Sequence, residues 1–126
     1  NANLYFAKGT LLEKTDTNKD AAIAAYKKAV ELKNDYFDAY YNLGALYFNE
    51  GARLANEANS IKDNAKYAKA KVVFDAKFSE AKPYLEKAYS LNPKDQSTLL
   101  SLKQLYATLN DAANYEKIKK ELDALK

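Results

Sequence analysis

Small and large apolar residues recur along the chain at helical spacings of three and four positions. Two stretches share one pattern, in which a small residue, a large residue and a second small residue are followed by a Leu. Its members are Ala22, Tyr26, Ala29 and Leu32 in the first stretch, and Ala81, Leu85, Ala88 and Leu91 in the second. Every member is displaced by the same 59 residues, which indicates an internal repeat of amphipathic helices.

Three further stretches carry a second helical pattern and lie beside the first two. They run from Tyr5 to Leu12, from Tyr40 to Tyr47 and from Leu99 to Tyr106. A last apolar stripe, near Ala112 to Leu125, has charged residues on its other faces. The chain is therefore predicted to alternate first and second helices, each pair packing side by side.

Composition agrees with an all-helical chain. Among 126 residues there are only three Gly and two Pro, too few for the turns of a many-stranded protein. The net charge of +3 is mild and favours solubility more than phosphate binding. No apolar stretch reaches the roughly 18 to 20 residues that cross a bilayer. We expect a soluble protein without membrane insertion, and both the cytoplasm and the periplasm stay open as its compartment.

In its middle unit the chain resembles the tetratricopeptide repeat family, in a bacterial-type form with an extended helical hairpin. The matching positions are Tyr40, Leu43, Gly44, Tyr47, Ala81, Leu85, Ala88 and Pro93. Gly44, Ala81 and Ala88 are predicted to let neighbouring helices approach closely. The resemblance implies an all-α fold, a right-handed α-solenoid of antiparallel helix pairs with an elongated central hairpin and a C-terminal capping helix pair.

The register of the repeat gives one tetratricopeptide-like domain over residues 1–126. Its first repeat spans 3–35, its second spans 37–95 with a helical insertion of 25 residues, and a degenerate capping repeat spans 96–126. The carboxyl-terminal stripe suits a cap because charged residues surround it. The amino end begins a repeat almost at once, so we expect further repeats or another domain before it.

The insertion lies between Gly51 and Phe78 and is rich in Ala, without Gly or Pro. We predict that both helices of the middle pair lengthen by about 12 residues each, with the tip at residues 62–64. On the second helix the packing stripe is expected to consist of Ala65, Ala68, Val72 and Ala76. Pro83 should kink this helix or break it in two.

Catalysis finds little support in the residues. Without His or Cys the chain lacks the commonest general base, the commonest metal ligand and a thiolate nucleophile. Glu13 with Asp16, and Glu50 with Glu57, are the carboxylate pairs available, and no phosphate loop or metal-ligand spacing accompanies them. We interpret them as surface charges and expect a protein that is not an enzyme, with no cofactor and no metal.

The resemblance implies a binding role, with another protein's peptide or helix held on the concave face that the first helices form. The residues expected there are Phe6, Thr10, Tyr41, Asn42, Ala45, Phe48, Asn49, Leu100, Ser101 and Gln104. Aromatic rings beside amides suit an extended chain. The alternative is that Phe6, Tyr41 and Phe48 only pack against neighbouring units.

Two other functions stay open. The chain could be a structural scaffold or a self-associating solenoid segment of a larger protein, in which the long hairpin sets a spacing. It could also bind nucleic acid through Lys62, Lys66 and Lys69 with Tyr67 nearby. Because Asp63 and Asp75 interrupt that basic patch, we favour a solvated helix face there.

Overall fold

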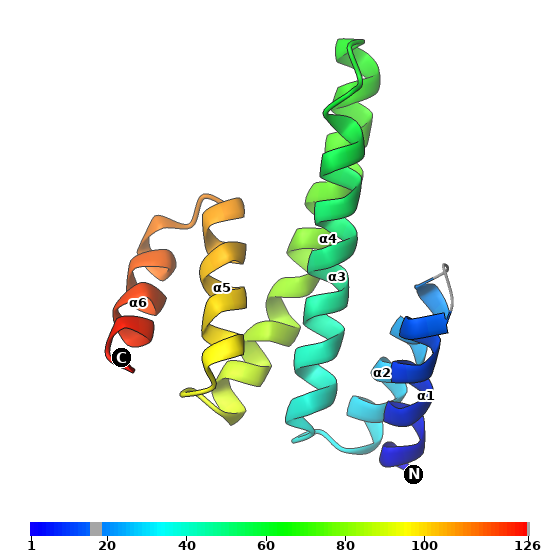
Figure 1. Ribbon diagram of the computed structural model, residues 1–126, viewed down its shortest axis with the longest axis vertical. Coiled ribbons are helices and arrows are strands. Elements are labelled where there is room, and N and C mark those ends of the chain that lie inside the picture. The colour runs from blue at the N-terminus through cyan, green and yellow to red at the C-terminus, as the bar shows by residue number, and fades with distance from the viewer. Residues whose placement is uncertain (16–18, 126) are drawn as a thin grey trace.

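The fold, a computed structural model, describes residues 1–15 and 19–125, and these ranges contain helices without any strand. The helices are α1 (Ala2–Thr15), α2 (Asp20–Leu32), α3 (Phe37–Ala58), α4 (Asn64–Leu91), α5 (Gln96–Thr108) and α6 (Ala112–Asp123). Each helix packs against the next along the chain, and α3 also touches α5. Figure 1 shows three helical hairpins side by side, the central one much the tallest. The predicted all-α solenoid of helix pairs is confirmed.

Small residues bring α3 and α4 into close contact, as the sequence indicates. Gly44 faces Leu85, and a Cβ added to Gly44 would lie only 2.6 Å from the Leu85 Cγ atom. Ala81 and Ala88 are each 0% exposed. Because these buried positions carry small residues, the helices can approach closely there.

Tyrosine hydroxyls donate hydrogen bonds to carboxylates on other helices. The pairs are Tyr26 to Glu13 at 2.6 Å, Tyr106 to Glu86 at 2.5 Å and Tyr89 to Glu121 at 2.5 Å. They join α2 to α1, α5 to α4, and α4 to α6. Burial is the main cause that raises the pKa of Tyr26, and its hydrogen bond to Glu13 raises it further. Burial likewise raises the pKa of Tyr106, followed by its hydrogen bond to Glu86. The hydrogen bond to Glu121, followed by burial, raises the pKa of Tyr89 to about 12.

The central hairpin projects beyond its neighbours as an arm, which we define as residues 52–77 (Figure 1). The two helices differ more in length within the arm than predicted. α3 ends at Ala58, seven residues past Gly51, whereas α4 begins at Asn64, fourteen residues before Phe78. The cause is Asp63, whose carboxylate caps α4 by accepting hydrogen bonds from the N–H groups of Ala65 and Lys66. The tip therefore spans residues 59–63, and Asn64 already belongs to α4.

The predicted packing stripe of the arm on α4 is wrong. Ala65, Ala68, Val72 and Ala76 are all exposed. Phe74 and Phe78 are buried instead, with Ala70 partly buried. An aromatic ring removes far more apolar area from water than an Ala methyl group, so the face that carries the two Phe residues turns inward.

Pro83 lies inside α4, which continues through it from Asn64 to Leu91. A break into two helices at Pro83 is therefore excluded. In Figure 1 the lower half of α4 runs away from α3 toward α5. Pro83 has no N–H group to donate to the Ser79 carbonyl, and such a missing bond is a common cause of bending in long helices.

Candidate functional site

The concave-face residues expected from the sequence come from α1, α3 and α5, and two of their aromatic rings also pack internally. The Phe6 ring centroid lies 5.8 Å from that of Tyr26 and 5.1 Å from that of Tyr36. The Phe48 ring lies 5.2 Å from the Phe78 ring. Phe6 and Phe48 are both partly buried. Each ring thus keeps only part of its surface for a partner.

Tyr41 and Asn42 link neighbouring helices across the same face. The Tyr41 ring stacks on Phe37 at 6.4 Å, and its hydroxyl lies 3.4 Å from the Ser101 hydroxyl on α5. Asn42 donates a hydrogen bond of 3.5 Å from Nδ2 to the Tyr26 hydroxyl on α2. These two residues hold α2, α3 and α5 in register and define the shape of the face.

The other expected residues divide by their exposure. Thr10 donates its hydroxyl to the carbonyl of Ala7 in its own helix, and Ala45 is partly buried. Asn49 and Gln104 are exposed, and Leu100 is 43% exposed. These last three side chains are the most accessible of the set.

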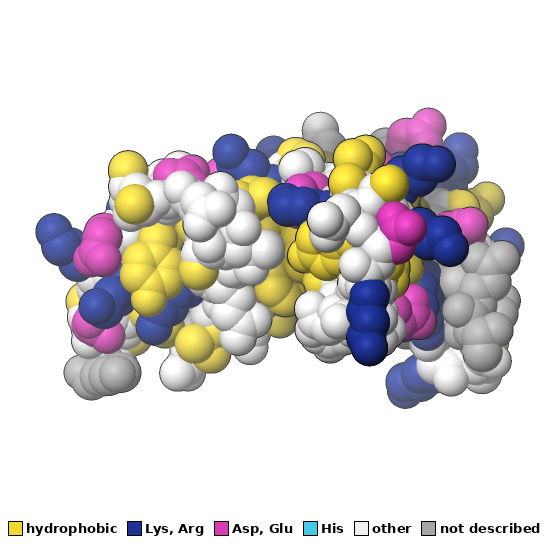
Figure 2. Space-filling model, turned by 90° about the horizontal axis from the view of Figure 1, so that it is seen from above, with side chains coloured by type: hydrophobic (Ala, Val, Ile, Leu, Met, Phe, Trp, Pro, Cys, Tyr) yellow, Lys and Arg dark blue, Asp and Glu magenta, His cyan; other side chains and the backbone are white. Residues whose placement is uncertain are grey.

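A hollow of about 430 Å³ opens where the arm rises above the end of α5. Phe48 is the one expected residue that lines it. The others are Ala52, Ala55 and Asn56 of α3, Asn59 of the tip, Tyr67, Lys71, Phe74, Asp75 and Phe78 of α4, and Thr108 of α5. In the view from above, hydrophobic side chains show in the recess between the arm and α5 (Figure 2). Sequence reasoning missed this site, although the spacing of Phe48, Ala52 and Ala55 marks one face of α3.

The hollow carries almost no net charge. Its Lys71 and Asp75 form an ion pair of 2.5 Å, and hydrogen bonding to Asp75 raises the pKa of Lys71. Both side chains are about half exposed, so the pair contributes little to stability. The rest of the lining consists of aromatic rings, Ala methyl groups, the amides of Asn56 and Asn59, and Thr108. An apolar lining with a few amides suits an uncharged segment of a partner.

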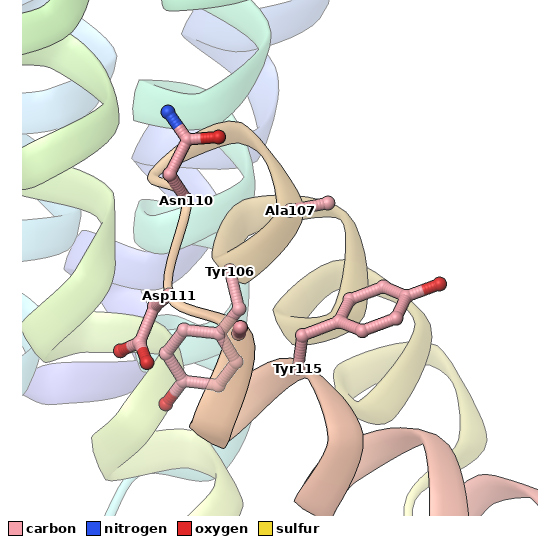
Figure 3. A pocket seen from close by; sticks show the side chains of 6 residues that line it. Tyr106, Ala107, Asn110, Asp111 and Tyr115 are labelled. Atoms are coloured by element: carbon pink, nitrogen blue, oxygen red, sulfur yellow. The ribbon is translucent and has the colours of Figure 1, made fainter.

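A second hollow, of about 250 Å³, lies at the turn between α5 and α6 (Figure 3). Its polar residues already serve the turn. Asn110 has φ 59°, the left-handed conformation that Asn tolerates, and the Asp111 carboxylate accepts from the Asn114 N–H at 3.2 Å to cap α6. The Tyr115 side chain points away from the others in Figure 3. We therefore assign this hollow to the structure of the turn.

The candidate carboxylates have structural partners. Glu50 and Glu57 both accept hydrogen bonds from Arg53, each at 3.0 Å. Glu13 accepts from Tyr26, and Asp16 lies outside the described residues. Over the residues that the structure describes, acidic side chains form no group of three that could hold a metal ion. The same residues include no helix that is both long and apolar enough to traverse a bilayer.

The stacked helix pairs define the chain as an α-helical repeat protein. Comparison of the sequence with family models gives two matches. A TPR repeat model matches residues 18–51, which include α2 and the base of α3, and a tetratricopeptide repeat model matches residues 75–95, which include the base of α4. No curated protein gave a match. The matched segments are tetratricopeptide repeats, and such repeats generally mediate contacts between proteins.

Proposed function

We propose that this protein is a non-enzymatic interaction module that holds a peptide or a helix of another protein against the face formed by α1, α3 and α5. The observation that carries the proposal is the hollow of about 430 Å³ at the base of the arm. It is large enough for one or two apolar side chains of a partner. The accessible residues Asn49, Leu100 and Gln104 extend the same surface along α3 and α5.

The chemistry of the hollow suits a partner segment that inserts apolar side chains into it and whose backbone forms hydrogen bonds with the amides of the lining. The edges of Phe48 and Tyr67 offer apolar contact with little loss of side-chain freedom. Asn56 and Asn59 are exposed on the α3 side, where each amide can both donate and accept. Ala52 and Ala55 leave room for the partner's backbone to approach.

The closely packed aromatic rings of the lining support binding without a large rearrangement. Phe74 and Phe78 are 8% and 5% exposed, and their centroids are 6.4 Å apart. A site that already has its final shape costs a ligand less ordering entropy than one that must form on binding.

A blocking substitution tests this proposal better than removal of a ring, because Phe48 also packs against Phe78. Ala55→Tyr fills the hollow and leaves the lining aromatics in place, and Ala113→Tyr adds the same ring to an exposed position of α6. Peptides selected from a displayed library against the unaltered protein are measured by fluorescence anisotropy. We expect affinity for Ala55→Tyr to fall at least about tenfold, and affinity for Ala113→Tyr to stay unchanged.

Leu100→Ser provides a second measurement on the same peptides, because Leu100 lies on α5, does not line the hollow and is 43% exposed. A loss of affinity there would extend the binding surface to α5. If selection yields no peptide, or if the peptides bind Ala55→Tyr as tightly as the unaltered protein, the proposal is rejected. Circular dichroism confirms that each variant keeps its helices.

A further inference from the structure

The outward side of the arm carries a second, separate surface, which we call the outer arm face. It consists of Ala65, Lys66, Lys69, Val72, Val73 and Ala76 of α4, and all six residues are exposed. A helix turns by about 100° per residue, which places the six side chains within roughly 120° of its circumference. Val72 is 71% exposed and Val73 is 51% exposed, values unusual for two adjacent Val residues on a helix.

The lysines of the outer arm face are free of ion pairs within the described part of the chain. Lys66 and Lys69 form no salt bridge there, nor does Lys62 at the tip. The nearest carboxylate in sequence, that of Asp63, caps α4. Positive charge thus concentrates near the tip, and the two valines lie nearer the base.

Two boundaries limit the outer arm face. Below Ala76 the next acid on this side is Glu80, whose charge acts on Lys27 of α2. On the flank toward the hollow, Lys71 is paired with Asp75. Between these limits an exposed apolar strip lies beside unpaired positive charge.

We propose that the outer arm face docks an acidic amphipathic helix of a partner protein. Charge complementarity selects the partner, because carboxylates on the docking helix pair with Lys66 and Lys69 while its apolar residues cover Val72 and Val73. Residues 64–76 of α4 extend for about 18 Å, the length of a helical segment of three to four turns. This site is separate from the hollow at the arm base.

Single-stranded nucleic acid fits this face less well than an acidic helix does. Such ligands need aromatic rings among the basic residues for base stacking. Tyr67, the aromatic of this part of α4, packs instead against Phe74 with centroids 6.3 Å apart, on the opposite side of the helix. A second copy that docks through its own outer arm face also fits poorly, since it would bring the same lysines toward this face.

The test uses two synthetic peptides that are helical over three to four turns. In the first, acidic peptide, one face of the helix carries Glu residues near one end and Leu residues near the other end. The second, basic peptide is the same except that Lys replaces each Glu. A single-stranded DNA oligonucleotide serves as the nucleic-acid probe. We expect the acidic peptide to bind the unaltered protein, with affinity that falls as salt increases, and the basic peptide to bind poorly.

Charge reversal and loss of the valines then locate the site. Lys66→Glu with Lys69→Glu, or Val72→Ser with Val73→Ser, should each weaken acidic-peptide binding about tenfold or more. The control Lys119→Glu with Lys120→Glu changes two exposed lysines of α6 by the same charge and should have no such effect. The basic peptide should bind the arm charge-reversal variant better than the unaltered protein, which a merely unfolded arm would not do.

Three results would overturn the proposal. The first is equal binding of the acidic peptide to the arm variants and the α6 control. The second is an oligonucleotide that binds the arm more tightly than the acidic peptide does. The third is a concentration-dependent dimer, seen by sedimentation, that disappears with Val72→Ser and Val73→Ser, because the face would then join two copies of the chain.

Discussion

Replacing Gly44 by Ala tests whether close packing of α3 on α4 holds the central pair together. Two effects oppose each other at this position. In an unobstructed helix interior, Ala is about 1 kcal/mol more favourable than Gly. Here the added Cβ would lie 2.6 Å from Cγ and 2.8 Å from Cδ2 of Leu85, and 3.1 Å from the Leu85 backbone nitrogen. Ordinary contact between carbon atoms begins near 3.5 Å.

The steric effect should be the larger one. Leu85 is 0% exposed, so its side chain has no open space to enter, and the nearby backbone nitrogen prevents relief by a rotamer change alone. Forcing an extra carbon into a packed core costs typically about 1 to 3 kcal/mol. A clash this short belongs at the upper end of that range. The net loss on Gly44→Ala is therefore about 1 to 2 kcal/mol of unfolding free energy.

Urea unfolding followed by circular dichroism measures this loss, and a double-mutant cycle identifies its cause. Leu85→Ala alone should cost about 2 to 5 kcal/mol. In the Leu85→Ala background the clash is largely gone, so Gly44→Ala should become neutral or stabilising by up to about 1 kcal/mol. If Gly44→Ala stabilises the unaltered protein by the full propensity term, the account of close packing is refuted.

Two further predictions concern pH and the proline inside α4. The pKa of Tyr89 rises from 10.0 in the unfolded chain to about 12 in the folded chain. The hydrogen bond from Tyr89 to Glu121 therefore stabilises the fold fully below pH 10, and this stabilisation is lost as the pH rises through 12. A urea midpoint that is unchanged between neutral pH and pH 12 would contradict this prediction. Pro83→Ala lets residue 83 donate to the Ser79 carbonyl and should raise the unfolding free energy by about 1 to 2 kcal/mol, whereas a lower melting temperature would show that the bend itself is needed for packing on α5.

The helix pairs and their contacts could be predicted because the repeat places small residues at fixed positions. Gly44, Ala81 and Ala88 recur in register with large apolar residues, and that combination fits few arrangements other than stacked helices. Local pattern and tertiary packing agree there, as they do in most of a natural core. The bases of α3 and α4 accordingly lie where the sequence indicates.

The arm could not be predicted in the same detail because its composition is ambiguous. In a stretch rich in Ala, several stripes show a spacing of three and four, and Ala65, Ala68, Val72 and Ala76 form one of them. The stripe that carries Phe74 and Phe78 packs inward because the aromatic rings bury more apolar area. The unequal lengths of α3 and α4 within the arm follow from Asp63, which caps α4. This cap determines where α4 begins, and the register of the repeat does not predict it.

The hollow at the arm base depends on where three helices end relative to one another, which the repeat pattern alone does not predict. It exists because the arm continues past Thr108, where α5 ends, so that the described helices leave this side of α3 and α4 open above the partly buried Phe48. Only the lengths of three helices taken together reveal that uncovered surface. The 25-residue insertion thus does more than lengthen a hairpin, because it creates an aromatic recess on one side and leaves lysines and valines uncovered on the other. A repeat unit of ordinary length would offer neither surface.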